Sequence, residues 1–358
     1  MTTLLDCIYR ESVIIEDIVE NKDINFSKFL DYIKDKTNII NEIIFIGSGT
    51  SNTSSVTACR FVEKVSNISA NVMLPNEFLS KKVYNKKGLY VFVSQSGTSS
   101  LTKKSLQNVK DMGLFTVAIT EAEDTPLAKE ADVHINMGCG YEEYGMRTIG
   151  YCASTFTLMV MGILMDKVKG ELSETQVKEY MDEALLVTEK HKRHCDDILK
   201  WFDNNKAHLM NTDAFAFYGN ESLWGVAKEG ALKVLEIARR FMCVGYEMDD
   251  GLHGPTMGFT NRHVIIILND GGKDEHLATS LARYIKNEVG QAYIIGKNAI
   301  DECDFCFEPI SDNFKFLEFA PVVQILAYRL AVDYGIVLKD MKSMIPMPES
   351  KYFNTHDE

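Results

Sequence analysis

The sequence predicts an α/β protein of two tandem domains, each a doubly wound five-stranded parallel sheet flanked by helices in a flavodoxin-like α/β/α arrangement. Three observations lead to this fold class. Short apolar runs alternate with helical stretches, this plan occurs twice, and 358 residues are enough for about two domains. Unbroken apolar runs separated by helices are typical of parallel strands buried on both faces, which require helices on both sides of the sheet.

The first half supplies five strand-like runs with helical segments between them. The first run, EIIFIGSG at 42–49, leads into a helix-like stretch that ends near Lys64. The other four are ISANVMLP (68–75), LYVFVSQ (89–95), LFTVAIT (114–120) and DVHINM (132–137). This order predicts one doubly wound sheet.

The second half repeats this plan, which indicates a duplicated domain. Its runs are AFAFYGN (214–220), RFMCVGYE (240–247), HVIIILND (263–270), AYIIGK (292–297) and DFCFEPI (304–310). We therefore expect an N-terminal helical segment at 1–34, a first domain at 35–165, a helical connection at 166–206, a second domain at 207–336 and a C-terminal tail at 337–358.

Composition excludes several classes of partner. A net charge of −13 argues against nucleic acid or an anionic membrane surface as the main partner. The N-terminus lacks the basic flank and apolar core of a signal peptide, and the most apolar run, Ser154–Met165, is too short to cross a bilayer. We expect a cytoplasmic protein whose eight cysteines are reduced, with the Cys303–Cys306 pair in a core strand.

Two hydroxyl-rich loops follow strands of the first half. One is Gly47–Ser51 and the other is Ser94–Ser99. Parallel sheets bind ligands where strand ends lead into helix N-termini, and Ser, Thr and Gly offer a phosphate short donors and a close backbone approach. The alternative is that these residues are helix caps and turns. Because both loops lie at the same sheet edge, phosphate binding is favoured, by Gly49, Thr50, Ser51, Ser94, Gln95, Ser96 and Ser99.

The corresponding loops of the second half, GNESL at 219–223 and LNDGGKD at 268–274, lack this chemistry. Asp270 and Asp274 would repel a phosphate, so we expect one phosphate site per chain. No dinucleotide fingerprint or metal-ligand constellation occurs in the sequence, and we expect neither a metal nor a cofactor.

The motifs GSGTS, SQSGTS, EGALKVLE (229–236) and HGP (253–255) resemble, in this order, those of the sugar isomerase (SIS) domain family. The resemblance spans nearly the whole chain. It is to the isomerase domain of glucosamine-6-phosphate synthase and to the fructosamine-6-phosphate deglycases, which have tandem SIS domains. It implies that Ser51, Ser94, Gln95, Ser96 and Ser99 hold a sugar 6-phosphate. The family loop reads S-Q-S-G-E-T, so Thr98 and Ser99 replace its last two residues.

Glu229, Lys233, Glu236 and Arg240 lie on one face of a predicted helix. Spacing alone favours a solvated ladder of ion pairs. The family resemblance implies instead that Glu236 is the base that moves a proton between C1 and C2 of an open-chain phosphosugar, with Lys233 near the substrate. A carboxylate suits this role if partial burial raises its pKa toward neutrality.

The resemblance also implies roles for His253 and for a lysine of the C-terminal tail. The equivalent histidine assists ring opening in the active site of a neighbouring subunit, which predicts a homodimer. The family pattern G-E-L-K-H-G-P has changed here, because Asp250 and Leu252 replace its glutamate and lysine. Lys351 is the best match for the tail lysine that forms a Schiff base with the sugar, the alternative being an ordinary solvated lysine.

EYGMRTIGY at 143–151 resembles the family's substrate loop, E-x-G-V-A-S-T-K-A. Thr148 fits that pattern, whereas Arg147 replaces a small residue. A buried arginine needs an anionic partner, which is either Glu142 or Glu143 or a second anion on the substrate, such as an amino-acid carboxylate.

We expect no glutaminase domain, because the first strand already begins near Ile43. The resemblance therefore points to cleavage of a sugar C–N bond rather than to glutamine-dependent synthesis. Arg147 favours a deglycase acting on a 6-phosphoketosamine. The alternatives are an amino-sugar-6-phosphate deaminase or ketose–aldose isomerase, and a non-catalytic regulator that only senses phosphosugars.

Overall fold

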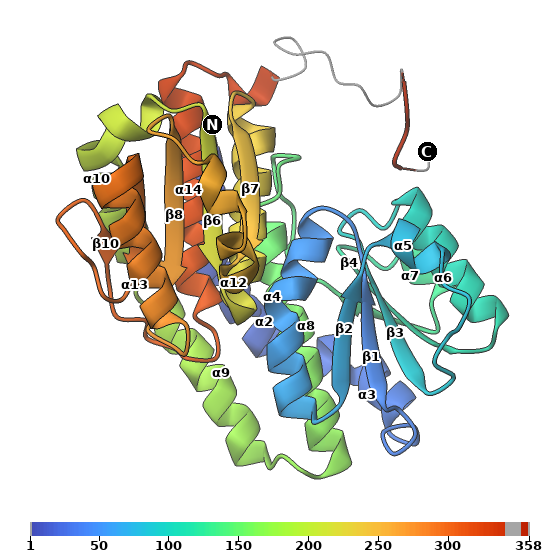
Figure 1. The fold of residues 1–358 in the computed structure, drawn as a ribbon. Coiled ribbons are helices and arrows are strands. Elements are labelled where there is room, and N and C mark those ends of the chain that lie inside the picture. Colours follow the sequence, from blue (N-terminus) through green and yellow to red (C-terminus); the bar gives the residue numbers. More distant parts are fainter. Residues whose placement is uncertain (1, 341–351, 357–358) are drawn as a thin grey trace. The chain divides into compact units, whose positions relative to one another are not determined.

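The chain forms two compact units, each built on its own parallel sheet (Figure 1). The structure is a computed structural model that describes residues 2–340 and 352–356. The first-sheet unit comprises residues 13–142, 149–182 and 352–356, and the second-sheet unit comprises residues 2–12, 143–148 and 183–340.

The first sheet has five parallel strands in the order β2-β1-β3-β4-β5, as predicted. Its central strand β3 is buried at all six residues, and Tyr90 of β3 pairs in register with Ile44 of β1. The strands are β1 (Glu42–Ile46), β2 (Ser69–Met73), β3 (Gly88–Val93), β4 (Phe115–Thr120) and β5 (Val133–Asn136).

Helices flank this sheet, and two of them are long. In α4, an apolar face packs along α8, and a Cβ at Gly162 of α8 would come within 3.2 Å of Val62 and Val65. The glycine thus permits close helix contact. The helices of this unit are α3 (Ser27–Ile33), α4 (Thr50–Ser66), α5 (Pro75–Leu79), α6 (Ser100–Asp111), α7 (Pro126–Glu130) and α8 (Ile149–Lys169).

Within the described residues, α8 alone is long and apolar enough to cross a membrane. The whole of its most apolar window is buried inside the protein. Burial on every face is the property of a core helix, and it explains why the sequence here shows no polar stripe.

The second sheet repeats the first, with order β10-β9-β8-β6-β7 and parallel pairing throughout. Position by position, β6 corresponds to β1, β8 to β3 and β9 to β4, as a duplicated domain predicts. The strands are β6 (Ala214–Gly219), β7 (Met242–Glu247), β8 (His263–Asn269), β9 (Gln291–Gly296) and β10 (Phe305–Cys306).

The second sheet is covered by helices that include α11 and the long apolar α14. They are α1 (Leu4–Tyr9), α10 (His191–Met210), α11 (Glu221–Lys233), α12 (Met248–Leu252), α13 (Glu275–Tyr284) and α14 (Phe316–Asp333). Short helical turns lie at Val234–Ala238, Pro255–Gly258, Ile285–Val289 and Leu338–Asp340. Two further helices, α2 (Glu11–Asn25) and α9 (Glu174–Thr188), contain residues of both units.

The expected placement of the cysteine pair in a core strand is wrong. Strand β10 has only two residues, Cys303 lies in the turn before it, and both Cys303 and Cys306 are exposed. The apolar run 304–310 predicted a longer buried strand. Only Phe305 and Cys306 pair with β9, at the edge of the sheet.

Candidate functional site

The loop between β1 and α4 approaches its neighbours too closely for side chains larger than glycine. A Cβ at Gly47 would lie 2.9 Å from the carbonyl oxygen of Val93 on β3. Gly49 is the N-cap of α4 and has a φ of 57°, in the left-handed region that glycine tolerates best. Its carbonyl accepts the backbone N–H of Thr53 at 3.1 Å. Thr50 and Ser51, which open the helix, are partly exposed at its N-terminus.

The loop between β3 and α6 carries the other predicted phosphate ligands. Ser94 is buried and donates its N–H to the carbonyl of Ile119 at 3.1 Å, while the hydroxyls of Ser96 and Thr98 lie 2.9 Å apart. Gly97 has a φ of 64°, and a Cβ there would lie 2.5 Å from Thr125. This loop conformation therefore requires glycine at position 97.

Gln95 carries the clearest sign of a missing ligand in this loop. Its Nε2 atom is buried and has no hydrogen-bond partner. A buried amide donor without a partner costs about 1–3 kcal/mol, so such groups usually mark a bound water, ion or ligand. Ser99, the N-cap of α6, likewise makes no side-chain cap, although its hydroxyl accepts from Thr102 at 3.2 Å.

The sheet order brings these two loops together. β1 and β3 are adjacent in the first sheet, and the strand order reverses between them. In doubly wound sheets the crevice at this reversal is the usual ligand site, since helices on opposite faces begin there with their N–H groups free. The structure thus brings the seven predicted phosphate-binding residues to one edge of one sheet.

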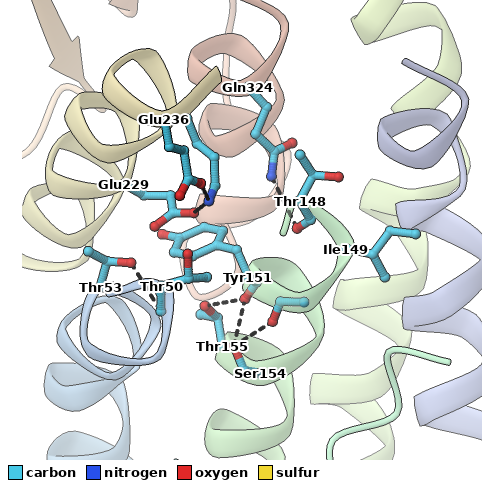
Figure 2. Close-up of polar contacts among 12 residues, drawn as sticks. Thr50, Thr53, Thr148, Ile149, Tyr151, Ser154, Thr155, Glu229, Glu236 and Gln324 are labelled. Carbon is cyan, nitrogen blue, oxygen red and sulfur yellow. Dashed lines mark hydrogen bonds and ion pairs between the residues drawn. The ribbon is translucent and has the colours of Figure 1, made fainter. Parts of the chain in front are cut away.

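The second-sheet unit holds a buried ion-pair cluster on α11 and the turn after it (Figure 2). The Lys233 ammonium lies 3.0 Å from Oε1 of Glu229, and both side chains are completely buried. It also pairs with Glu236, whose side chain is 33% exposed. Burial would lower the pKa of Lys233, but the charges of Glu229 and Glu236 outweigh it and raise that pKa. Spacing alone favoured a solvated ladder of ion pairs here. The structure has instead a buried cluster in which only the Glu236 carboxylate is accessible.

A local change of helix type sets the position of Glu236. The regular helix α11 ends at Lys233, and residues Val234–Ala238 form a π-helical turn that stops at Arg239, which has a φ of 51°. π-turns are rare and are found frequently at functional sites. The motif spacing predicts a continuous helix and gives no signal for this turn.

His253 lies in the loop after α12, as predicted, and is exposed. Its Nδ1–H donates to the carbonyl of Asp249 at 2.9 Å, because a carbonyl can only accept, and Nε2 is left as the acceptor. This hydrogen bond and the charges of Asp249 and Asp250 raise the pKa of His253.

Arg147 and Thr148 lie in the segment before α8. Thr148 is buried, and its carbonyl accepts from Nε2 of Gln324 at 3.3 Å (Figure 2). Glu143 forms a two-point ion pair with Arg10, at 2.7 and 3.1 Å, which lowers the pKa of Glu143 to about 2. Arg10, which sequence reasoning missed, thus takes the carboxylate that was one proposed partner of Arg147.

The other proposed partner, Glu142, caps the start of α8. Its two carboxylate oxygens accept the backbone N–H groups of Ile149 and Gly150, each at 3.1 Å.

The remaining predicted catalytic residue, Lys351, lies outside the described residues. Within residues 2–340 and 352–356, no group of three or more His, Cys, Asp or Glu side chains is arranged to hold a metal ion.

Comparisons with known proteins agree with this architecture. Residues 40–165 match the SIS domain family. The glutamine–fructose-6-phosphate aminotransferase (isomerizing) of Clostridium tetani is 26% identical over 273 residues, which are 74% of this chain and 44% of the relative. The chain spans about half or less of the length of the curated relatives that it matches.

Solved structures share the fold over nearly the whole chain. A protein of Clostridium difficile described as a candidate phosphosugar isomerase superposes with a TM-score of 0.86 at 23% identity, covering 96% of this chain and 97% of that one. A glucosamine-6-phosphate deaminase from Thermotoga maritima gives a TM-score of 0.70 at 22% identity, covering 92% and 96%.

The fold and the loops define a tandem doubly wound α/β protein with a hydroxyl-rich edge on its first sheet. Residues 40–165 match the SIS domain family, and the second sheet repeats the fold of the first.

Proposed function

We propose that this protein is a phosphosugar isomerase-type enzyme that cleaves the C–N bond of a 6-phosphoketosamine, as a fructosamine-6-phosphate deglycase does. The observation that carries the proposal is the buried, unpartnered Nε2 of Gln95 within a hydroxyl-rich loop at the reversal point of the first sheet. A phosphate there would accept from Gln95 and from the hydroxyls of Ser51, Ser94, Ser96 and Ser99, close to the N-termini of α4 and α6.

The chemical step needs a base that reaches C1 and C2 of the open-chain substrate. In our proposal Glu236 removes a proton from C1, which gives an enaminol, and returns it to C2. The product is an imine at C1, whose cleavage with water gives a hexose 6-phosphate and the free amine. The partial exposure of Glu236 beside Lys233 supports this role, since the ammonium holds the carboxylate in one orientation.

His253 and Lys351 complete the proposed machinery. With its Nδ1–H donated to Asp249, His253 has Nε2 available to exchange a proton with the ring oxygen or the leaving amine. Its exposure supports a role at the site of a neighbouring subunit, and hence a homodimer. Lys351 would assist release of the amine: its amino group adds to C1 of the imine and displaces the amine, and water then hydrolyses the resulting Schiff base to the hexose 6-phosphate.

Arg147 supports the choice of an amino-acid adduct. We propose that the Arg147 guanidinium binds the carboxylate of the amino acid that leaves. Without that second anion the same base would serve an amino-sugar-6-phosphate deaminase or a ketose–aldose isomerase, which is our second candidate.

A non-catalytic phosphosugar sensor is the third candidate function. It would need the phosphate loops but not the Glu236–Lys233 pair, so the presence of that pair favours an enzyme. We further propose a cytoplasmic location without nucleic-acid, membrane or cofactor partners, in line with the net charge of −13.

A coupled product assay tests the proposal. The protein is incubated separately with fructoselysine 6-phosphate and with glucosamine 6-phosphate, and NADPH is followed with glucose-6-phosphate dehydrogenase. Glucose 6-phosphate formed from the ketosamine, without added phosphoglucose isomerase, is the expected result. Signal only from glucosamine 6-phosphate, and only with the isomerase, would instead establish the deaminase. Binding of sugar phosphate with no turnover of either substrate would favour the non-catalytic sensor.

A further inference from the structure

The C-terminal residues Asn354–His356 lie against the loop that we propose for substrate phosphate. The backbone N–H of Ser100 donates to the carbonyl of Thr355 at 3.1 Å. Ser99 and His356 form an isolated antiparallel bridge beside this bond. Ser100 is the first residue of α6 and Ser99 is its N-cap. A backbone carbonyl from the end of the chain therefore occupies the first N–H group of this helix.

We propose that this segment and the substrate phosphate compete for the N-terminus of α6. The inference rests on the proposed phosphate loop and adds a regulatory contact to it. The first N–H groups of a helix have no partner within the helix and lie at its positive end, so they accept either a carbonyl oxygen or an anion. One donor cannot make two full hydrogen bonds at once.

The Ser100 N–H matters because other donors of the loop are already used. The N–H of Ser94 donates to Ile119, that of Gly97 to the carbonyl of Ser94, and that of Thr98 to the hydroxyl of Ser96. A phosphate at α6 would therefore draw on the first turn of the helix, including Ser100. Its charged oxygens make stronger hydrogen bonds than the neutral Thr355 carbonyl, so phosphate displaces the segment.

The segment is suited to release because it buries little. Residues 352–356 are all exposed, with Tyr352 at 74% and Phe353 at 55% of full exposure. Its own turn is held locally, because the N–H of His356 donates to Oδ1 of Asn354 at 3.2 Å and the Thr355 hydroxyl lies 3.0 Å from Nδ1 of His356. Release therefore breaks the contacts to α6 without disturbing a core.

Two chains test the competition: the full chain and one that ends at Lys351, which keeps the proposed Schiff-base lysine. We expect calorimetry with glucose 6-phosphate to show binding about two- to tenfold tighter for the shorter chain, as for the loss of one competing hydrogen bond. In the full chain, carboxypeptidase should remove the C-terminal residues faster when glucose 6-phosphate is added, because the released segment is accessible.

Two variants of the full chain act as controls. Ser100→Pro removes the shared N–H at a helix position where proline is well tolerated, so deletion of 352–358 in this background should no longer change affinity. Tyr352→Ala/Phe353→Ala alters two exposed side chains and keeps the backbone of 354–356, so it should bind as the unmodified chain does.

Equal or weaker binding by the shorter chain would overturn the competition, and so would slower digestion of the C-terminal segment in the presence of glucose 6-phosphate, which would mean that the segment closes over bound phosphate. If neither chain binds glucose 6-phosphate, the proposed role of the loop in phosphate binding is wrong, and the proposed competition is then wrong as well.

Discussion

The Lys233 ammonium and the Glu229 carboxylate form an ion pair at 3.0 Å between two side chains that have no exposure to solvent. Burying two charges is costly, and their attraction repays that cost only when the geometry is good. The same ammonium also contacts the partly exposed Glu236. We interpret Lys233 as the counter-ion that holds the buried carboxylate of Glu229 and the accessible carboxylate of Glu236 side by side.

Replacing Lys233 should therefore destabilise the fold strongly. In Lys233→Met the Glu229 carboxylate stays buried without its counter-ion, which costs about 3–5 kcal/mol of unfolding free energy. Urea denaturation followed by circular dichroism measures this loss. Lys233→Met/Glu229→Leu should recover much of it because no uncompensated charge remains. A loss below about 1 kcal/mol in the single variant would contradict a buried ion pair at this position.

Glu236→Gln should abolish most activity and leave binding intact. Removal of a general base typically lowers the rate about 10²–10⁴-fold, whereas the phosphate loop of the first sheet is unchanged. Turnover of the ketosamine and calorimetric binding of glucose 6-phosphate give the two readouts. Glu221→Gln, at the exposed start of the same helix, is the matched control and should keep full activity. Equal activity in Glu236→Gln would remove the base from our mechanism.

Gln95→Ala should weaken phosphate binding without weakening the fold. The Gln95 amide nitrogen has no partner in the ligand-free protein, so its removal loses no hydrogen bond there, and the melting temperature should stay the same or rise. Affinity for glucose 6-phosphate should fall about tenfold, as for a lost hydrogen bond to a charged group. Gln107→Ala, an exposed glutamine on α6, should change neither quantity. A drop in melting temperature with unchanged affinity would make Gln95 a structural residue.

The fold and the position of the two hydroxyl-rich loops could be predicted because both depend on local patterns. Buried parallel strands such as β3 give unbroken apolar runs, and the hydroxyls of Ser94–Ser99 follow directly in the chain. The prediction of two parallel sheets needed only the repeated strand–helix alternation. The roles expected of Lys233 and Glu236 came from the family resemblance, whereas spacing alone favoured an exposed ladder of ion pairs at a place where Lys233 is buried.

What could not be predicted depends on contacts between distant parts of the chain. Arg10 and Glu143 are 133 positions apart, and nothing near either residue indicates their ion pair. The contact between Ser99 and His356 is of the same kind. The π-helical turn under Glu236 was missed because helix propensities do not distinguish a π-turn from an α-helix.

Asp249→Asn should shift the pH profile of the enzyme. The hydrogen bond to the Asp249 carbonyl raises the pKa of His253, and the Asp249 carboxylate raises it further. The variant keeps the carbonyl and loses the charge, so the pKa of His253 falls part of the way. The limb of the kcat/KM profile that reports His253 should therefore move to lower pH. Asp213→Asn, whose carboxylate pairs with Arg262, is the control and should leave the profile in place.

Glu318 and His194 should give the folded state two opposing dependences on pH. The Glu318 carboxylate accepts the N–H groups of Ile310 and Ser311, and its carbonyl accepts Nε2–H of His194 at 2.8 Å. Burial raises the pKa of Glu318 from 4.5 to about 7, despite these N–H donors. Burial also lowers the pKa of His194 from 6.5 to about 4.

The signs follow from which state binds more protons. Between pH 4.5 and 7 the folded state holds the extra proton on Glu318, so this residue makes stability fall as pH rises. Between pH 4 and 6.5 the unfolded state holds the extra proton on His194, so this residue makes stability rise with pH. Each effect is on the order of 3 kcal/mol, and over the shared window the two largely cancel.

Single variants should separate the two effects. Relative to the unmodified protein, Glu318→Gln should gain stability between pH 5 and pH 7, because only the rise from His194 remains. His194→Gln should lose stability over the same interval, because only the fall from Glu318 remains. Urea midpoints at the two pH values measure both, and the comparison within each variant removes any constant cost of the substitution. If both variants keep the pH dependence of the unmodified protein, neither group titrates as its burial requires.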